Sequence, residues 1–429
     1  MKKITILILN LAVLFLLVNF SFAANYKTNK LSKFGFLSQG VGITPQGASE
    51  LGTPWLRPHP GKAVWGKIEK KQGKFSWKKL DKIVKAAQKK NLNLLITVWP
   101  YAMWDQNQCH KNLKDAKGFE KELPKRRGAP CDYEAYKNFL TKLVERYDKD
   151  KKSDMKGLKY GVKYWEILNE PEMNQKNSPD LVFFQGTAKD YLKILKESYK
   201  TIKKADKKSK ILHAGMAGSG DFMVSFWKKI FKKSKGKYFD IGNIHSIDSG
   251  VADLNASSYK GLLQKYDIQK SFWITEVQIT SQEESFGLQA KAKSEEEQAA
   301  EIIKSYIQAY KAEAEKIFYT IYQTNQYVPE NLRYAALIED GRKKPGYYAM
   351  QTMVSKIDYF SKVENLAEGQ YKFTISDRTV YVLWSDQEIA PEIPQELQNK
   401  VVTITDMGGN VSTKYGQEIN LTANPVFVE

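Results

Sequence analysis

Two short stretches of the sequence place carboxylates where buried strands are expected to end. The first, YWEILNEPE (164–172), begins as an aromatic and apolar strand and breaks at Asn169-Glu170-Pro171. The second, FWITEVQI (272–279), carries Glu276 within an apolar run. A buried carboxylate without a partner is costly, so each one needs a purpose. One carboxyl group acting as an acid and a second acting as base or nucleophile are the minimum for cleaving a glycosidic bond.

Glu166 lies inside the first of these strands, two pleats before Glu170. We interpret Glu166 as structural, paired with an arginine or with hydrogen-bond donors as buried charges are. We interpret Glu170 as the reactive group. The alternative for Glu170 is a helix-capping or loop carboxylate in a barrel of another kind.

The elements that must position these residues alternate along the chain. Short apolar, β-branched or aromatic runs predict eight strands, at 33–39, 54–58, 92–100, 163–170, 211–218, 241–247, 272–279 and 317–324. Helical patterns occupy 77–91, 133–148, 187–206, 221–233, 257–264, 294–312 and 345–356, with a turn or two around 44–51. This α/β pattern predicts a (β/α)₈ TIM barrel over residues 24–357. Barrel enzymes place their chemistry at the carboxyl ends of the strands, where Glu170 and Glu276 both fall.

The residue pattern changes from helical to strand-like after the last predicted helix. Residues 358–429 alternate with a period of two and have turns at Ser376-Asp377 and Gly408-Gly409-Asn410. They predict a small antiparallel, β-sandwich-like C-terminal domain. We expect this domain to be structural, with sugar binding as the alternative.

The N-terminus has the pattern of a secretory signal peptide. Lys2 and Lys3 precede an apolar stretch (4–20), and Ser21-Phe22-Ala23 is a small-x-small cleavage site. Residues 1–23 therefore predict a secreted, periplasmic or cell-surface protein without stable membrane insertion once the signal is removed. A retained membrane anchor is the alternative, because the apolar stretch approaches the length that spans a bilayer.

The chain has two cysteines, Cys109 and Cys131, on either side of a polar, charged insertion. In an oxidising compartment this pair predicts a disulfide that closes a surface loop. The alternatives are two unpaired thiols or, with His110 beside them, a metal site. The chain has four histidines and no H-x-x-x-H pair. We therefore predict no metal and no cofactor.

The formal net charge is +19, which by itself would be compatible with nucleic-acid binding. The lysines, however, are spread along amphipathic helices, as in WKKLDKIVKAAQKKN, and this is typical of solvated helix faces. We therefore expect no nucleic-acid partner. An acidic or cell-wall polymer is the partner that a secreted basic protein would favour.

Several motifs together resemble the clan A glycoside hydrolases, a superfamily of retaining (β/α)₈ enzymes. Asn169-Glu170-Pro171 follows the fourth strand, and Glu276 closes the seventh. The segment beginning TPWLRPHPGKAVWGKIE resembles the opening strands of that clan, with an arginine closing the second strand. The resemblance covers roughly residues 33–357. It is closest to the branch that contains β-xylosidases and cellulase-like enzymes.

The resemblance implies a role for each matching residue. Glu170 would be the general acid/base and Glu276 the nucleophile that forms a covalent glycosyl-enzyme. Asn169 would hold the sugar 2-hydroxyl. Arg57 would bond Glu276 and keep it ionised, since a nearby cation lowers the pKa of a carboxylate. His245, closing the sixth strand, would line the sugar pocket.

The sequence departs from the clan pattern at two strand ends. Many members carry His-x-Tyr after the sixth strand, whereas this chain has His245-Ser246-Ile247. The eighth strand often ends in a tryptophan that floors the sugar site, whereas this chain has Tyr322, which we expect to replace a missing aromatic. We also predict Trp99 and Trp104 as platforms for the apolar faces of sugars, with the filling of core or loops as the alternative.

The sequence thus predicts a secreted retaining glycoside hydrolase that cleaves β-linked saccharides without a cofactor. One alternative is a carbohydrate-binding protein that kept its cleft but lost turnover. A second alternative is a basic surface protein that binds an acidic polymer. Xylan, mannan, glucan and uronic-acid polymers all remain open as substrates, as does the choice between endo and exo cleavage.

Overall fold

The computed structural model describes residues 30–429 except 248–250, 282–283, 286–287, 290–293 and 389–390. The predicted signal peptide at 1–23 lies outside this range. Among the described residues, no helix combines the length and the apolar character needed to cross a membrane.

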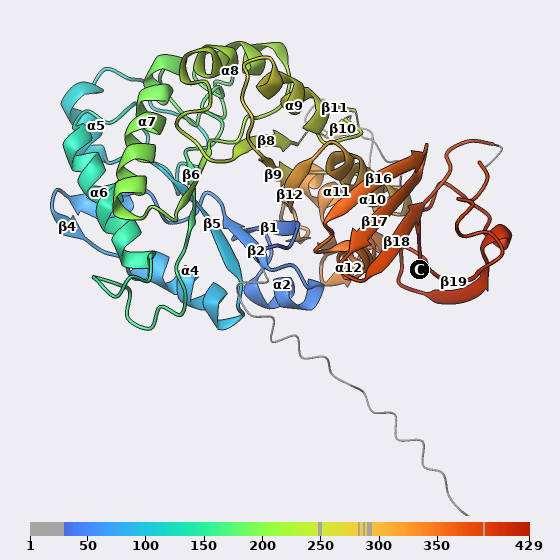
Figure 1. Ribbon diagram of the computed structural model, residues 1–429. Coiled ribbons are helices and arrows are strands. Elements are labelled where there is room, and N and C mark those ends of the chain that lie inside the picture. The colour runs from blue at the N-terminus through green and yellow to red at the C-terminus, as the bar shows by residue number, and fades with distance from the viewer. Residues whose placement is uncertain (1–29, 248–250, 282–283, 286–287, 290–293, 389–390) are drawn as a thin grey trace, which may run out of the picture.

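Eight parallel strands form the central barrel (Figure 1). They are β1 (Phe34–Ser38), β2 (Trp55–Pro58), β5 (Asn93–Val98), β6 (Tyr164–Ile167), β7 (Lys210–His213), β8 (Gly242–Ser246), β9 (Phe272–Val277) and β12 (Ala314–Tyr319). Their order in the sheet is β7-β6-β5-β2-β1-β12-β9-β8. Isolated bridges from Leu212 to Ile241 and from Met216 to Ile244 join the two end strands and close the ring. The predicted (β/α)₈ TIM barrel is confirmed.

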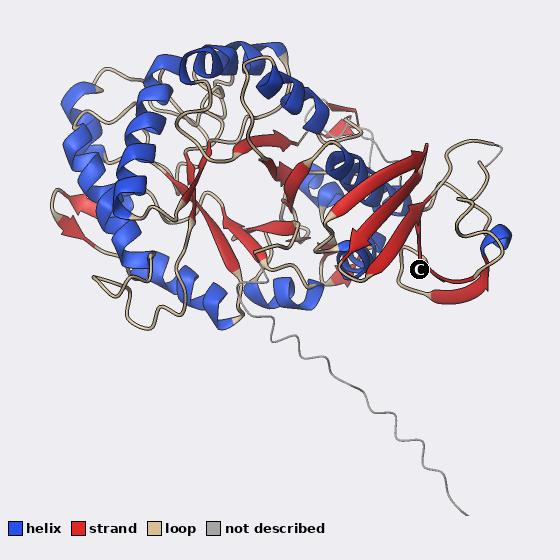
Figure 2. Cartoon of the chain, viewed as in Figure 1, coloured by secondary structure: helices blue, strands red, loops and turns tan. Residues whose placement is uncertain are grey.

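Helices surround the strands (Figure 2). They are α2 (Pro45–Leu51), α4 (Lys78–Lys89), α6 (Tyr133–Tyr147), α7 (Ala188–Ala205), α8 (Asp221–Ser234), α9 (Ala256–Gln264), α10 (Glu295–Lys311) and α12 (Pro345–Ile357). In α7 the side chain of Thr187 and that of Asp190 form a reciprocal capping box at the N-terminus. The buried residues of α7, such as Tyr191, Leu195 and Ile202, recur at helical spacing, so its lysines face solvent.

Short elements occupy the connections between barrel strands and helices. They are α3 (Trp65–Ile68), β3 (Glu69–Lys71), β4 (Lys74–Phe75), α5 (Met103–Cys109), β10 (Glu284–Ser285), β11 (Leu288–Gln289), β13 (Gln323–Thr324), α11 (Glu330–Ala335), β14 (Ile338–Glu339) and β15 (Arg342–Lys343). The longest connection without regular structure follows α5. Cys109 and Cys131 form a disulfide across it, with their Cα atoms 5.8 Å apart, which confirms the predicted pairing.

The inside of the barrel is layered because side chains alternate along each strand. One layer is apolar and includes Trp55, Leu95, Leu212, Trp273 and Phe318. Two residues further along β2, β5 and β9, the inward side chains are polar: Arg57, Thr97 and Thr275. The site is therefore built on a rigid apolar base, at the carboxyl ends of the strands.

The C-terminal region is one antiparallel sheet in the order β16-β17-β18-β21-β19-β20. The strands are β16 (Lys362–Ala367), β17 (Gln370–Ile375), β18 (Arg378–Leu383), β19 (Val401–Thr405), β20 (Val411–Tyr415) and β21 (Val426–Val428), with a 3₁₀ turn η1 (Gly416–Glu418). Phe373, Val382 and Phe427 join the core cluster of the barrel, while Ile393 and Leu397, from a non-strand segment, join the separate cluster of the sheet. The predicted small C-terminal antiparallel β domain is confirmed, and its described strands form one sheet.

Candidate active site

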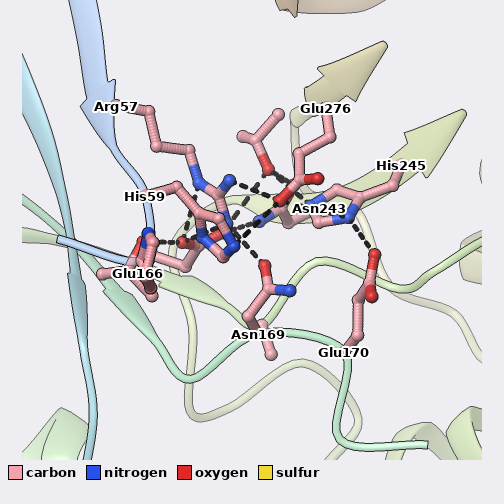
Figure 3. A network of polar contacts seen from close by, with 12 residues as sticks. Arg57, His59, Glu166, Asn169, Glu170, Asn243, His245 and Glu276 are labelled. Carbon is pink, nitrogen blue, oxygen red and sulfur yellow. Dashed lines mark hydrogen bonds and ion pairs between the residues drawn. The ribbon is translucent and has the colours of Figure 1, made fainter. Parts of the chain in front are cut away.

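Arg57 is the centre of the polar network at the mouth of the barrel (Figure 3). From the end of β2, its Nε donates to Glu166 (2.9 Å), its Nη1 to Glu276 (2.7 Å) and its Nη2 to Asn169 Oδ1 (2.6 Å). Burial alone would lower the pKa of Arg57, but Glu166 and Glu276 outweigh burial and raise it. The guanidinium therefore remains a fixed cation between two carboxylates.

Glu166 is fully buried and has a donor for each oxygen. Besides Arg57, it accepts from the hydroxyl of Thr97 and from Asn243 Nδ2 (2.6 Å). The predicted pairing of Glu166 with an arginine and with hydrogen-bond donors is confirmed, and these bonds compensate for the cost of burying the charge.

The two polar atoms of the Asn169 side chain, just after β6, differ in their hydrogen bonding. Its Oδ1 accepts from Arg57, which fixes the orientation of the amide. Its buried Nδ2 has no hydrogen-bond partner among the described residues. The Asn169 N–H group is therefore well placed to donate to an acceptor of a bound ligand, since leaving a buried donor without a hydrogen bond is costly.

Glu276 reaches the barrel mouth because β9 carries a bulge. The register with β8 passes from Ile244–Ile274 to His245–Glu276, so one extra residue is accommodated in β9. Neighbouring residues Thr275 and Glu276 can thus both bond inside the barrel, which a regular strand would not allow. Burial raises the pKa of Glu276, while His245 and Arg57 oppose the shift. The expected bond from Arg57 to Glu276 is present, but the net pKa shift is upward, against the expectation that Arg57 alone keeps Glu276 ionised.

Glu170 approaches the same point from the other side of the barrel. The strand ends at Ile167, and left-handed backbone at Leu168 (φ 73°) and Glu170 (φ 39°) turns the side chain inward. Its backbone N–H donates to Gly215 O (3.1 Å), which fixes this conformation. Such backbone is strained for non-glycine residues and is typical of functional sites. Burial raises the pKa of Glu170 to about 8, against the effect of Arg57.

His245 links Glu170 to the polar layer beneath. Asn243 directs its Nδ2 at Glu166, so its Oδ1 accepts from the Thr275 hydroxyl (2.8 Å). Thr275 Oγ1 then accepts from His245 Nε2 (3.0 Å), which leaves His245 Nδ1 unprotonated and 2.7 Å from Glu170 Oε1. Burial lowers the pKa of His245 to about 4, so the ring is neutral near pH 7. The Glu170 carboxyl therefore carries the proton of this bond.

The two carboxylates are close together. One oxygen of Glu170, one oxygen of Glu276 and a ring nitrogen of His245 all lie within 4.8 Å of one another. Three such groups could ligate a divalent ion, but the guanidinium of Arg57, 2.7 Å from Glu276, opposes a second cation there. An approach of two carboxyl oxygens to within 4.8 Å is compatible with the carboxyl separation of retaining glycosidases, about 5–5.5 Å.

A cavity of about 620 Å³ opens over these carboxylates. Its lining includes both glutamates, His59 after β2, Gln278 after β9, and Phe119 and Phe183 from connecting loops. None of the last four residues was predicted from the sequence. The one available signal was the position of His59 and Gln278 two residues beyond Arg57 and Glu276. The two phenylalanines are far from any strand end and gave no signal.

Three of the predicted sugar contacts are not among the residues that line the cavity. Trp99 is fully buried and its indole donates to Pro60 O (2.5 Å). Trp104 donates to Glu69 O (2.8 Å) and packs edge-on against Trp65. Tyr322 is buried against Phe36, outside the cavity. In each case core packing uses an aromatic side chain that strand-end position alone would assign to the sugar.

A (β/α)₈ barrel with this carboxylate pair at its strand ends defines the class of the glycoside hydrolases. The model of glycosyl hydrolase family 10 matches residues 61–353, and the chain belongs to this family. The predicted resemblance to clan A and the prediction of an enzyme are confirmed. No curated protein matches the chain.

Solved structures of low sequence identity share the fold. A family 39 glycoside hydrolase from Bacteroides cellulosilyticus is 18% identical, with a TM-score of 0.67 over 92% of this chain and 80% of that chain. A β-xylosidase from Caulobacter crescentus is 13% identical, with a TM-score of 0.62 over 93% and 96%. A glucosidase from Croceicoccus marinus is 11% identical, with a TM-score of 0.63 over 92% and 95%.

Proposed function

We propose that this protein is a secreted, retaining glycoside hydrolase that cleaves β-linked oligosaccharides or polysaccharides by double displacement. The observation that carries the proposal is the pair Glu170 and Glu276, buried and with oxygens within 4.8 Å of each other. Such a close approach supports direct attack by one carboxylate on the anomeric carbon, since inverting enzymes hold their carboxyl groups about 6.5–9.5 Å apart to admit a water.

Glu276 attacks the anomeric carbon while Glu170 gives its proton to the leaving oxygen. Arg57 stabilises the carboxylate form of Glu276 before the attack. Glu170, now ionised, then takes a proton from water, which attacks the glycosyl-enzyme and releases Glu276. Asn169 Nδ2, without a partner in the described part of the chain, donates to the sugar 2-hydroxyl. Acid, nucleophile and water suffice, so no cofactor enters the proposal.

The identity of the sugar is inferred from the structural neighbours and from the net charge of the chain. Neighbours of the same fold that are named as a β-xylosidase and a glucosidase support xylo- and gluco-configured substrates as the first candidates of this proposal. The net charge of +19 favours a cell-wall or acidic polymer, so mannans and uronic-acid polymers are candidates too.

The test is hydrolysis of a panel of aryl β-glycosides and β-linked polysaccharides, with product anomers followed by NMR. Wild type is compared with Glu170→Gln and Glu276→Gln. We expect products of retained configuration and no turnover by Glu276→Gln. Inverted products would overturn the mechanism, and sugar binding without turnover by wild type would favour a binding protein.

Secretion is supported by the signal-like residues 1–23 and by the Cys109–Cys131 disulfide, which an oxidising compartment favours. N-terminal sequencing of the protein exported by a bacterial host should give a chain beginning at Ala24. A chain that keeps Met1 in the membrane fraction would indicate an anchor instead.

A further inference from the structure

Phe119 presents an aromatic ring to the cavity. It lies in the insertion closed by the disulfide, and 37% of its surface is exposed. Its ring lines the same cavity as Glu170 and Glu276. Exposing a large apolar side chain inside a cavity has a cost, and exposed apolar surface in a cleft marks a binding site.

The backbone under this ring is held in an unfavourable conformation. Gly118 (φ 80°) and Phe119 (φ 56°) are both left-handed, which is unusual for a bulky residue. The buried guanidinium of Arg127 fixes the segment by donating to the carbonyls of Gly118, Lys117 and Val182. Strained backbone that neighbours hold in place is typical of ligand clamps.

His59 connects Phe119 to the reacting position along the cavity wall. His59 Nε2 lies 3.8 Å from Glu276 Oε1. The Phe119 ring centroid lies 5.8 Å from that of His59 and 5.5 Å from that of Phe183, and all three residues line the cavity. A saccharide chain that is bound at Glu276 and extends past His59 would meet Phe119.

We propose that Phe119 is the stacking platform for a second sugar unit, so that the enzyme selects oligosaccharide chains over glycosides of one sugar. This inference deepens the proposed function and rests on it. Arg127 and the disulfide-bridged insertion act as positioning elements for the ring. The flat ring covers the apolar C–H face of that unit, and burial of ring and sugar face supplies affinity.

The test compares each enzyme on two substrates of the same sugar: the oligosaccharide found in the panel and the β-glycosyl fluoride, whose leaving group carries no second unit. Phe119→Ala should lower the oligosaccharide-to-fluoride ratio of kcat/KM about tenfold, mainly through KM. Phe119→Tyr, which keeps the flat ring, should restore the ratio. Phe222→Ala is the matched control, because Phe222 on α8 is 39% exposed and does not line the cavity. An equal loss on both substrates, or no change in the ratio, would overturn the inference.

A binding experiment separates this inference from the proposed function. Glu276→Gln is titrated with β-1,4-linked xylo-, manno- and cello-oligosaccharides of one to four units by calorimetry. The affinity gained between one and two units should disappear when Phe119→Ala is added, even if wild type turns over no substrate. Affinity that does not depend on Phe119 at any length would count against the platform, whatever the outcome of the hydrolysis assay.

Discussion

The two glutamates of the site have different surroundings, which favour a proton on Glu170 rather than on Glu276. Glu276 lies 2.7 Å from the Arg57 guanidinium, which supports its charge. Glu170 bonds instead to a neutral histidine, and burial raises its pKa to about 8. Burial raises the pKa of both groups, but only Glu276 has a cation next to it to support the charged form, so the surroundings favour Glu170 as the acid.

This arrangement predicts the alkaline limb of the pH profile. Activity (kcat/KM) should fall as the pH rises through about 8, because Glu170 loses the proton it must donate. Glu170→Gln should lower kcat/KM by about 10²–10⁴-fold on substrates with poor leaving groups. Its residual kcat/KM should no longer fall at alkaline pH. If kcat/KM of Glu170→Gln still falls above about pH 8, another group causes the alkaline fall in activity.

The same pKa predicts a change in stability with pH. The folded-state pKa of Glu170, about 8, lies above its usual value of 4.5, so the folded state holds more protons between those two values. Stability contributed by this group is therefore lost as the pH rises from about 4.5 to about 8. Relative to wild type, Glu170→Gln should gain on the order of 2–4 kcal/mol of unfolding free energy between pH 5 and pH 9. Urea unfolding at both pH values measures this, and a pH-independent difference would contradict it.

Gly215 is required by the close approach of His245. A Cβ at this position would lie 1.9 Å from His245 Nε2, and the Gly215 carbonyl also accepts from the Glu170 backbone. Gly215→Ala should displace the imidazole and lower kcat/KM by roughly 10–100-fold, since misplacement by about 1 Å can cost that much. Gly261→Ala, where a Cβ meets nothing within 4 Å, is the control. Equal activity of the two variants would show that His245 tolerates the shift.

At the scale of elements, irregularities of the barrel strands aim the reactive groups. The bulge in β9 turns Glu276 inward beside Thr275, and the left-handed turn after β6 does the same for Glu170. Regular strands would have directed at least one of these side chains into the helical layer.

The insertion between α5 and α6 depends on its crosslink. Cys109 and Cys131 are 22 residues apart, and for a loop of this size a disulfide contributes about 3 kcal/mol. The double variant Cys109→Ser/Cys131→Ser should lose an unfolding free energy of that order in urea titrations. Its KM for oligosaccharides should rise more than its kcat falls, because Phe119 lies within the loop. Unchanged stability would show that Arg127 alone holds the insertion.

At the scale of the whole molecule, barrel and C-terminal sheet share one core. Phe360 packs edge-on against Tyr310 of α10 (5.0 Å), and buried Asp358 accepts from the backbone N–H of Lys33 (2.8 Å) next to β1. Lys356 and Arg378 both pair with Glu429 near the C-terminus. These contacts tie the sheet to both the beginning and the end of the barrel.

The shared core predicts cooperative unfolding. Differential scanning calorimetry should give a single transition whose calorimetric and van't Hoff enthalpies agree. A chain truncated after Ile357 should aggregate or melt at a lower temperature, because apolar surface on α10 and α12 would be exposed. Two resolved transitions, with the barrel transition unchanged in the truncated chain, would show that the sheet is an independent unit.

The sequence by itself determined the barrel, the positions of Glu170 and Glu276 at its strand ends, and the pairing of buried Glu166 with an arginine. Strand and helix periodicity is a local property, and chain order places the ends of parallel strands on one face. A charged residue inside an apolar run can be recognised in the sequence as paired or functional, because burying it without a partner would be too costly. The disulfide followed in the same way from two cysteines and a polar loop.

Tertiary structure alone decided which aromatic side chains meet the cavity. Trp99, Trp104 and Tyr322 have the composition and position of sugar platforms, yet each is used in the core or in its hydrogen bonds. Phe119 and Phe183 reach the cavity from loops whose course depends on Arg127 and on contacts far apart in sequence. The bulge in β9 also depends on its neighbouring strands. Local periodicity does not contain such long-range packing, so the wall of the site could be read only from the folded chain.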